Sequence, residues 1–141
     1  FDSCERGLSD KTSVDVSDYA RQTKEEAEFE KNWFSSTIDD LKKALIGFDF
    51  IEIYKGWIPD RFPEVESKKF AFVHVDVDLY QPTLDSLKFF YPRLLPGGVI
   101  VVDDYGYSVF PGAKRAVDEF LRGTDCSVFY ETPMGSCFII K

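Results

Sequence analysis

The sequence lacks the features that mark nucleic-acid-binding, membrane-spanning and disulfide-stabilised proteins. Acidic residues outnumber basic ones by 25 to 17, and the resulting net charge of −8 argues against a basic surface for a phosphate backbone. No apolar run approaches the roughly 20 residues needed to cross a bilayer. The three cysteines are odd in number and show no paired spacing, which argues against a disulfide framework. We therefore expect a cytoplasmic protein with reduced thiols and with neither nucleic-acid nor membrane partners.

Two further absences limit the chemistry. The sequence contains one histidine and no cluster of histidine and cysteine, so a zinc site is not expected. No glycine-rich loop opens a helix anywhere, so the usual cradle for a cofactor phosphate is not expected either. Apolar side chains, in contrast, are plentiful. With 44% hydrophobic residues, the 141-residue chain is large enough for one domain with a packed core.

The alternation of apolar patterns predicts an α/β fold with an open sheet, mostly parallel and closed by a C-terminal antiparallel hairpin. Apolar and β-branched runs predict strands at residues 48–54, 70–77, 99–102, 126–131 and 136–140. Helical spacing of apolar residues predicts helices at residues 18–33, 36–46, 82–94 and 113–121.

The segment at residues 10–46 is charged and rich in helix-forming residues. We expect a helical segment there, which acts either as a lid or as a solvated connector. Ser36 is the expected N-cap of the helix at 36–46, and Gly47 is its expected stop.

Four carboxylates follow two of the predicted strands. Asp76 and Asp78 close the strand at 70–77, and Asp103 and Asp104 follow the strand at 99–102. A right-handed crossover makes these strands parallel and usually adjacent, so their carboxyl ends meet where α/β sheets bind ligands. Asp103 and Asp104 would point to opposite faces of an ideal strand, and they converge only if the chain turns there.

Gathered carboxylates repel one another unless some are protonated or a cation lies among them. Oxygen ligands alone are typical of Mg²⁺. A purely structural interpretation stays open, in which Asp78 caps the following helix and Asp104 begins a turn. His74 shares a strand face with Asp76, and it is either a structural histidine or a general base.

Four stretches of the sequence, taken together, match one known family. They are residues 72–80, 90–98, 102–106 and 111–117. These stretches resemble the macrocin O-methyltransferase (TylF-like) family, which contains class I methyltransferases that use S-adenosylmethionine and Mg²⁺. The resemblance implies a partial Rossmann-like sheet, from the family's third strand to its seventh, in a single domain over residues 1–141.

The resemblance also implies roles for single residues. Asp76, Asp103 and Asp104 look like the family's metal-binding acids. Asp78 looks like its candidate general base, and the choice between Asp78 and His74 stays open. In this scheme the metal lowers the pKa of a substrate hydroxyl, the base takes its proton, and the oxygen attacks the methyl group.

The cofactor half of the site is matched only in fragments. Asp2 and Ser3 resemble the end of the family's second strand, where the cofactor ribose binds. The residues that resemble the turn near the adenine are Gly56, Trp57 and Ile58. In the family's sheet order, 3-2-1-4-5-7-6, the strand at 70–77 then has an exposed apolar edge. A longer chain, re-pairing with the third strand, or a homo-oligomer would cover that edge.

The leading interpretation is an Mg²⁺-dependent O-methyltransferase that acts on a hydroxyl of a small acceptor, either a sugar or another secondary metabolite. Asp76-Val77-Asp78 also fits the Asp-x-Asp motif of a nucleotide-sugar glycosyltransferase, but the second pair, Asp103-Asp104, favours methyl transfer. A truncated, non-catalytic binding or dimerisation module is the third interpretation, and the missing glycine-rich loop supports it.

Overall fold

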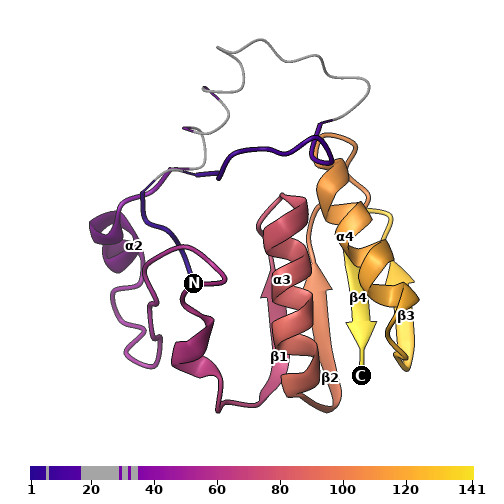
Figure 1. The fold of residues 1–141 in the computed structure, drawn as a ribbon. Helices are drawn as coiled ribbons and strands as arrows, with labels where there is room; N and C mark the ends of the chain where they lie inside the picture. The colour runs from indigo at the N-terminus through magenta and orange to yellow at the C-terminus, as the bar shows by residue number, and fades with distance from the viewer. Residues whose placement is uncertain (6, 17–28, 30–31, 33–34) are drawn as a thin grey trace. The chain divides into compact units, whose positions relative to one another are not determined.

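A computed structural model describes residues 1–5, 7–16, 29, 32 and 35–141 (Figure 1). The chain divides into two compact units, one made of Phe1–Asp10 and Gln22–Glu64 and the other of Lys11–Arg21 and Val65–Lys141. The helix predicted at 18–33 lies outside the described residues, except for Phe29 and Asn32. Residues 17–28, 30–31 and 33–34 of the predicted lid segment therefore also lie outside the described residues. The single-domain organisation stays a prediction.

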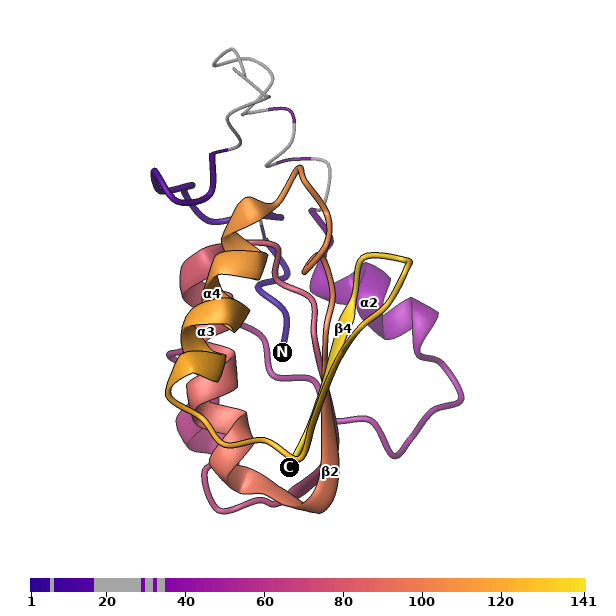
Figure 2. The same cartoon turned by 90° about the vertical axis from the view of Figure 1, so that its right-hand side faces the viewer.

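The second unit contains a four-stranded sheet with two helices on one of its faces (Figures 1 and 2). The strand order is β1-β2-β4-β3. The strands are β1 (Phe70–Val75), β2 (Leu94–Val102), β3 (Val128–Glu131) and β4 (Cys137–Ile140). β1 and β2 pair in parallel, whereas β4 is antiparallel to both β2 and β3. The α/β class and the closing hairpin are confirmed, although only one pairing of this described sheet is parallel.

The two helices, α3 (Tyr80–Phe90) and α4 (Pro111–Arg122), cover the sheet because each has one apolar face. Alternate residues of β2 and β4 are buried, as expected for strands with one covered face. The fully buried side chains include Leu87, Ile100, Val102, Val117 and Ile139. This core fixes the directions in which β1 and β2 end.

β2 begins earlier than its β-branched run indicates. The predicted helix at 82–94 ends at Phe90 and is followed by a short 3-10 helix, η2 (Tyr91–Arg93). Phe70 is aligned with Leu94 but Phe72 with Val99, so β2 bulges between these positions. Gly97 has a φ of 75° and a Cβ on Gly98 would lie 2.8 Å from the Leu95 carbonyl oxygen. The Pro-Gly-Gly sequence therefore forms a bulge inside the strand and does not precede it.

β1 lies at the edge of the described sheet. The side chain of Phe72 in this strand is 60% exposed. The apolar strand edge expected from the sequence is therefore present among the described residues of the second unit. What covers it, whether a longer chain, re-pairing with the third strand or a homo-oligomer, stays a prediction.

The first unit contains α2 (Ile38–Ala44) and the first three residues of a short 3-10 helix, η1 (Phe62–Val65). The N-cap of α2 is Thr37 and not Ser36. The Thr37 hydroxyl accepts a hydrogen bond from the Asp40 backbone N–H and donates one to the Asp40 carboxylate, at 3.2 and 2.6 Å. This reciprocal pair satisfies an N–H at the helix start, which explains the one-residue difference.

The strand predicted at 48–54 does not form a ladder. The one bridge in this region joins Asp2 to Lys55 in parallel, with hydrogen bonds from Asp2 N to Tyr54 O and from Gly56 N to Asp2 O. A strand needs a neighbouring strand to satisfy its backbone N–H and C=O groups. Among the described residues, the neighbour of this segment is the single bridge residue Asp2. The prediction of a full strand was therefore wrong for this chain.

Among the described residues, every helix is too short or too polar to cross a bilayer.

Candidate metal site at the strand ends

The first pair of acids lies in the short connection between β1 and α3. Asp78 has a φ of 60°, in the left-handed region that aspartate tolerates better than most residues. Around it the Leu79 N–H donates to the Val77 carbonyl oxygen at 2.5 Å, which makes a tight turn. β1 therefore ends at Val75, two residues earlier than predicted, and Asp76 and Asp78 belong to a turn.

The second pair begins where the ladder of β1 and β2 ends. The Asp103 N–H donates to the Val75 carbonyl oxygen at 2.9 Å, so Asp103 is held beside the end of β1. Asp104 has a φ of 57°, and its carbonyl oxygen accepts a hydrogen bond from the Tyr107 N–H at 3.1 Å. Asp103 and Asp104 can converge only if the chain turns, and this turn occurs at Asp104.

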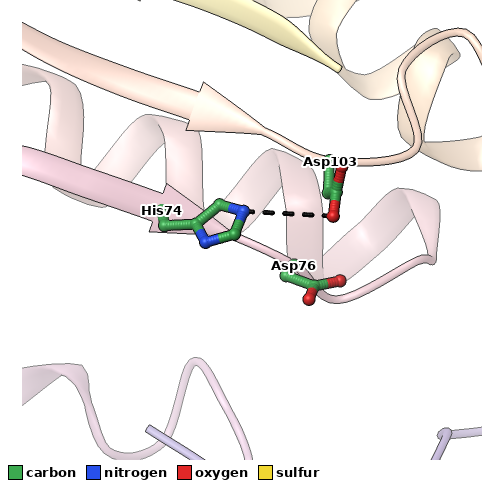
Figure 3. Close-up of side chains that lie close together, drawn as sticks. All are labelled: His74, Asp76 and Asp103. Carbon is green, nitrogen blue, oxygen red and sulfur yellow. Dashed lines mark ion pairs between the residues drawn. The ribbon is translucent and has the colours of Figure 1, made fainter. Parts of the chain in front are cut away.

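The side chains at these strand ends form two overlapping groups. One contains His74, Asp76 and Asp103, and the other contains Asp76, Asp78 and Asp104. In each group, one possible ligand atom from every member lies within 4.8 Å of the others. Figure 3 shows His74 and Asp103 pointing toward each other with Asp76 alongside; His74 Nε2 and Asp103 Oδ2 are 4.0 Å apart. All five residues singled out from the sequence are therefore brought to one place.

The predicted metal ligands are divided between these groups. Asp76 belongs to both, whereas Asp103 and Asp104 belong to different ones. The choice of ligands and the choice of base stay predictions.

Two of these carboxyl groups, those of Asp76 and Asp104, have raised pKa values. Partial burial raises the pKa of Asp76, the neighbouring Asp103 raises it further, and His74 partly offsets the increase. Partial burial also raises the pKa of Asp104; a hydrogen bond with Asp78 opposes that rise, while Asp103 and Asp76 add to it. Both shifts mean that the ionised carboxylates are disfavoured here, by partial burial and by their mutual repulsion, and a divalent cation would favour them.

Ser136 is a site residue that sequence reasoning missed. Its hydroxyl donates to Asp103 Oδ1 at 2.6 Å. Ser136 follows the turn between β3 and β4. In this turn the Gly135 carbonyl oxygen accepts a hydrogen bond from the Gly106 N–H at 2.6 Å. The hairpin therefore supports the loop after β2. No local motif identifies Ser136, because its position depends on how the hairpin docks.

The residues expected to bind the cofactor lie in the first unit. Asp2 Oδ1 accepts a hydrogen bond from the Cys4 N–H at 2.6 Å, and the Asp2 carbonyl accepts one from Gly56 N at 2.8 Å. Asp2 and the Gly56 turn are thus adjacent. The side chains of this group that are neither buried nor fully exposed are Ser3, Trp57 and Ile58. Their cofactor roles stay predictions.

Comparison with known proteins identifies one family. The family model described as Macrocin-O-methyltransferase (TylF) matches residues 40–128. Mycinamicin III 3''-O-methyltransferase from Micromonospora griseorubida is 36% identical over 72 residues, which are 51% of this chain and 27% of that enzyme. The 8-demethyl-8-(2,3-dimethoxy-alpha-L-rhamnosyl)-tetracenomycin-C 4'-O-methyltransferase from Streptomyces olivaceus is 39% identical over 57 residues, which are 40% of this chain and 22% of that enzyme.

A solved structure shows the same fold. The O-methyltransferase NovP superposes with a TM-score of 0.75 and 23% sequence identity, over 99% of this chain and 57% of NovP. The sheet is therefore that of a class I methyltransferase, as expected. The chain matches about a quarter of the length of the two curated relatives.

Proposed function

Because the chain belongs to the macrocin O-methyltransferase (TylF) family, we propose that it carries the metal and acceptor part of an S-adenosylmethionine-dependent O-methyltransferase. The acceptor is a hydroxyl group of a sugar or of another secondary metabolite. The observation that carries this proposal is the convergence of five side chains at the ends of β1 and β2. The name of one relative, which specifies a rhamnosyl compound, supports a sugar acceptor. The family match also favours methyl transfer over glycosyl transfer.

The side chains at the strand ends fit Mg²⁺. The donors are mainly carboxylate oxygens, the ligands that this hard cation prefers. Partial burial first, and neighbouring carboxylates second, raise the pKa values of Asp76 and Asp104, and a cation among these groups would offset both effects. Asp76, Asp103 and Asp104 would hold the ion. When bound, Mg²⁺ supplies a positive charge that lowers the pKa of an acceptor hydroxyl.

The remaining chemistry belongs to the chain's own residues. Asp78 is part of the group with Asp76 and Asp104, and a tight turn fixes its backbone. Its carboxylate is the proposed base that takes the acceptor proton. His74 is the alternative base. Its Nε2 lies 4.0 Å from Asp103 Oδ2, within the group that also contains Asp76. Alignment of the acceptor oxygen with the methyl donor is the main contribution that such a site makes.

Replacing single acids in the full-length protein tests the proposal. Asp76→Asn and Asp103→Asn each preserve shape but remove a charge, and we expect each to abolish Mg²⁺-dependent methyl transfer with the circular dichroism spectrum unchanged. Asp125→Asn is the matched control, because Asp125 is an exposed acid in the connection between α4 and β3. Full activity of either variant would remove that residue from the site, and full activity after chelation of divalent cations would remove the metal.

A further inference from the structure

A buried carboxylate outside the acidic groups contacts the start of α3. Asp15 is only 3% exposed. Its Oδ1 accepts a hydrogen bond from the Tyr80 N–H at 2.6 Å, and Tyr80 is the first residue of α3. Its Oδ2 accepts hydrogen bonds from the Thr12 N–H at 2.9 Å and from the Thr12 hydroxyl at 2.7 Å. Three donors thus compensate the burial of this charge.

The start of α4 packs against the same carboxylate. Gly112 is the second residue of α4, and a Cβ placed on it would lie 2.0 Å from Asp15 Oδ1 and 2.7 Å from Tyr80 N. Only glycine leaves room for this arrangement. Asp15 therefore lies where the segment after Lys11, α3 and α4 meet, and these two helices follow the two acidic strand ends.

The contact with Tyr80 fixes one end of the loop that carries the first acidic pair. The other end is fixed where Val75 O accepts the hydrogen bond from Asp103 N. Leu79, the N-cap residue of α3, has no side chain that can accept a hydrogen bond. The carboxylate of Asp15, 65 positions earlier in the sequence, supplies the missing acceptor. Its negative charge also suits the positive end of a helix dipole.

We propose that Asp15 is a positioning residue for the acidic site. By holding Tyr80 N against the start of α4, it sets the path of residues 76–79, so that the carboxylates of Asp76 and Asp78 face that of Asp104. This inference rests on the proposed function, to which it adds a residue that does not touch the cation or the acceptor. Sequence reasoning gave Asp15 no role.

The test compares four variants of the full-length protein. Asp15→Ala removes the acceptor, and we expect about a tenfold loss of Mg²⁺ affinity in calorimetry without cofactor or acceptor, the low end of the range for residues that orient metal ligands. Asp15→Asn keeps an oxygen for Tyr80 N and restores most of the affinity. Gly112→Ala displaces Asp15 and changes affinity in the same direction as Asp15→Ala. Asp125→Asn, with the same loss of charge, keeps the wild-type affinity.

Amide hydrogen exchange in the peptide that contains Tyr80 gives a second readout, independent of cation and activity. We expect faster exchange in Asp15→Ala than in Asp15→Asn at equal global stability. Wild-type affinity together with wild-type exchange in Asp15→Ala would overturn the inference. If Asp15→Ala does not fold, wild-type values in Gly112→Ala would overturn it equally.

A different result would contradict the proposed function. A wild-type protein without cation-dependent methyl transfer would contradict that function. The exchange at Tyr80 would still decide whether Asp15 holds the loop.

Discussion

The two units of the chain differ in how their apolar side chains are packed. In the second unit, Leu87, Ile100 and Ile139 are completely buried. In the first unit, the described apolar residues that are buried are Cys4, Leu8 and Phe62, and Phe50 is 78% exposed. None of the seven residues of α2 is buried. The acids of the proposed metal site therefore stand on a packed framework, whereas a single bridge and one short turn position the proposed cofactor residues.

This difference extends to the residues proposed to bind the metal and the cofactor. Asp76 and Asp103 are placed by strands whose register is set by buried neighbours. Asp2 and Gly56 are placed by two backbone hydrogen bonds. We infer that the second unit holds the proposed metal ligands more firmly than the first unit holds the proposed cofactor residues.

Truncating one apolar residue in each unit gives the largest expected contrast. Ile100→Ala leaves a cavity between the sheet and its helices, and we expect a loss of about 2–5 kcal/mol in the free energy of unfolding. Phe50→Ala removes a side chain already in contact with solvent, and we expect a change within about 0.5 kcal/mol. Urea denaturation of both variants measures the two values, and equal losses would remove the contrast.

The reactivity of the two buried cysteines gives the next contrast, one in each unit. Burial raises the pKa of the Cys137 thiol to about 12, and β4 holds this residue in the sheet. Burial also raises the pKa of Cys4, with contributions from Asp2, but Cys4 lies outside any strand or helix. Alkylation of both requires local opening, which needs less free energy where fewer contacts must break.

We therefore expect Cys4 to react with iodoacetamide at least about tenfold faster than Cys137. Mass spectrometry of digested protein after timed labelling measures both rates. Cys126, a free cysteine that is not fully buried, serves as the internal reference for reagent activity. Equal rates at Cys4 and Cys137 would mean that the two units open together.

A smaller effect is expected from the hydroxyl that orients Asp103. Ser136→Ala removes the hydrogen bond to Asp103 Oδ1, and we expect about a tenfold loss of Mg²⁺ affinity at most, with little change in stability. Ser127→Ala is the control, since Ser127 is an exposed serine of the loop before β3. Calorimetric titration with Mg²⁺ compares them, and equal affinities would show that Ser136 does not orient the site.

What the sequence predicts well depends on local pattern. An apolar run followed by Asp76 and Asp78, and another followed by Asp103 and Asp104, predict two strand ends with gathered acids. The structure has both strand ends, because an apolar run followed by polar residues is a property of a short segment. The closing hairpin was also predictable from local pattern, because Pro133, Met134 and Gly135 interrupt two short apolar runs.

What the sequence does not predict depends on contacts between distant segments. β2 includes a Pro-Gly-Gly bulge that its β-branched run does not reveal, and residues 48–54 need a neighbour that their own pattern does not supply. Ser136 reaches Asp103 across the hairpin, and Asp15 reaches Tyr80 from far along the chain. No periodicity or motif encodes such contacts.

The proposed metal site can be tested by calorimetric titration of residues 1–141 with Mg²⁺ and, separately, with S-adenosylmethionine. We predict saturable Mg²⁺ binding that is lost in Asp76→Asn, and no binding of S-adenosylmethionine at micromolar concentrations. Equal Mg²⁺ heats in wild type and Asp76→Asn would contradict the metal site. Micromolar binding of S-adenosylmethionine would contradict the contrast between the two units.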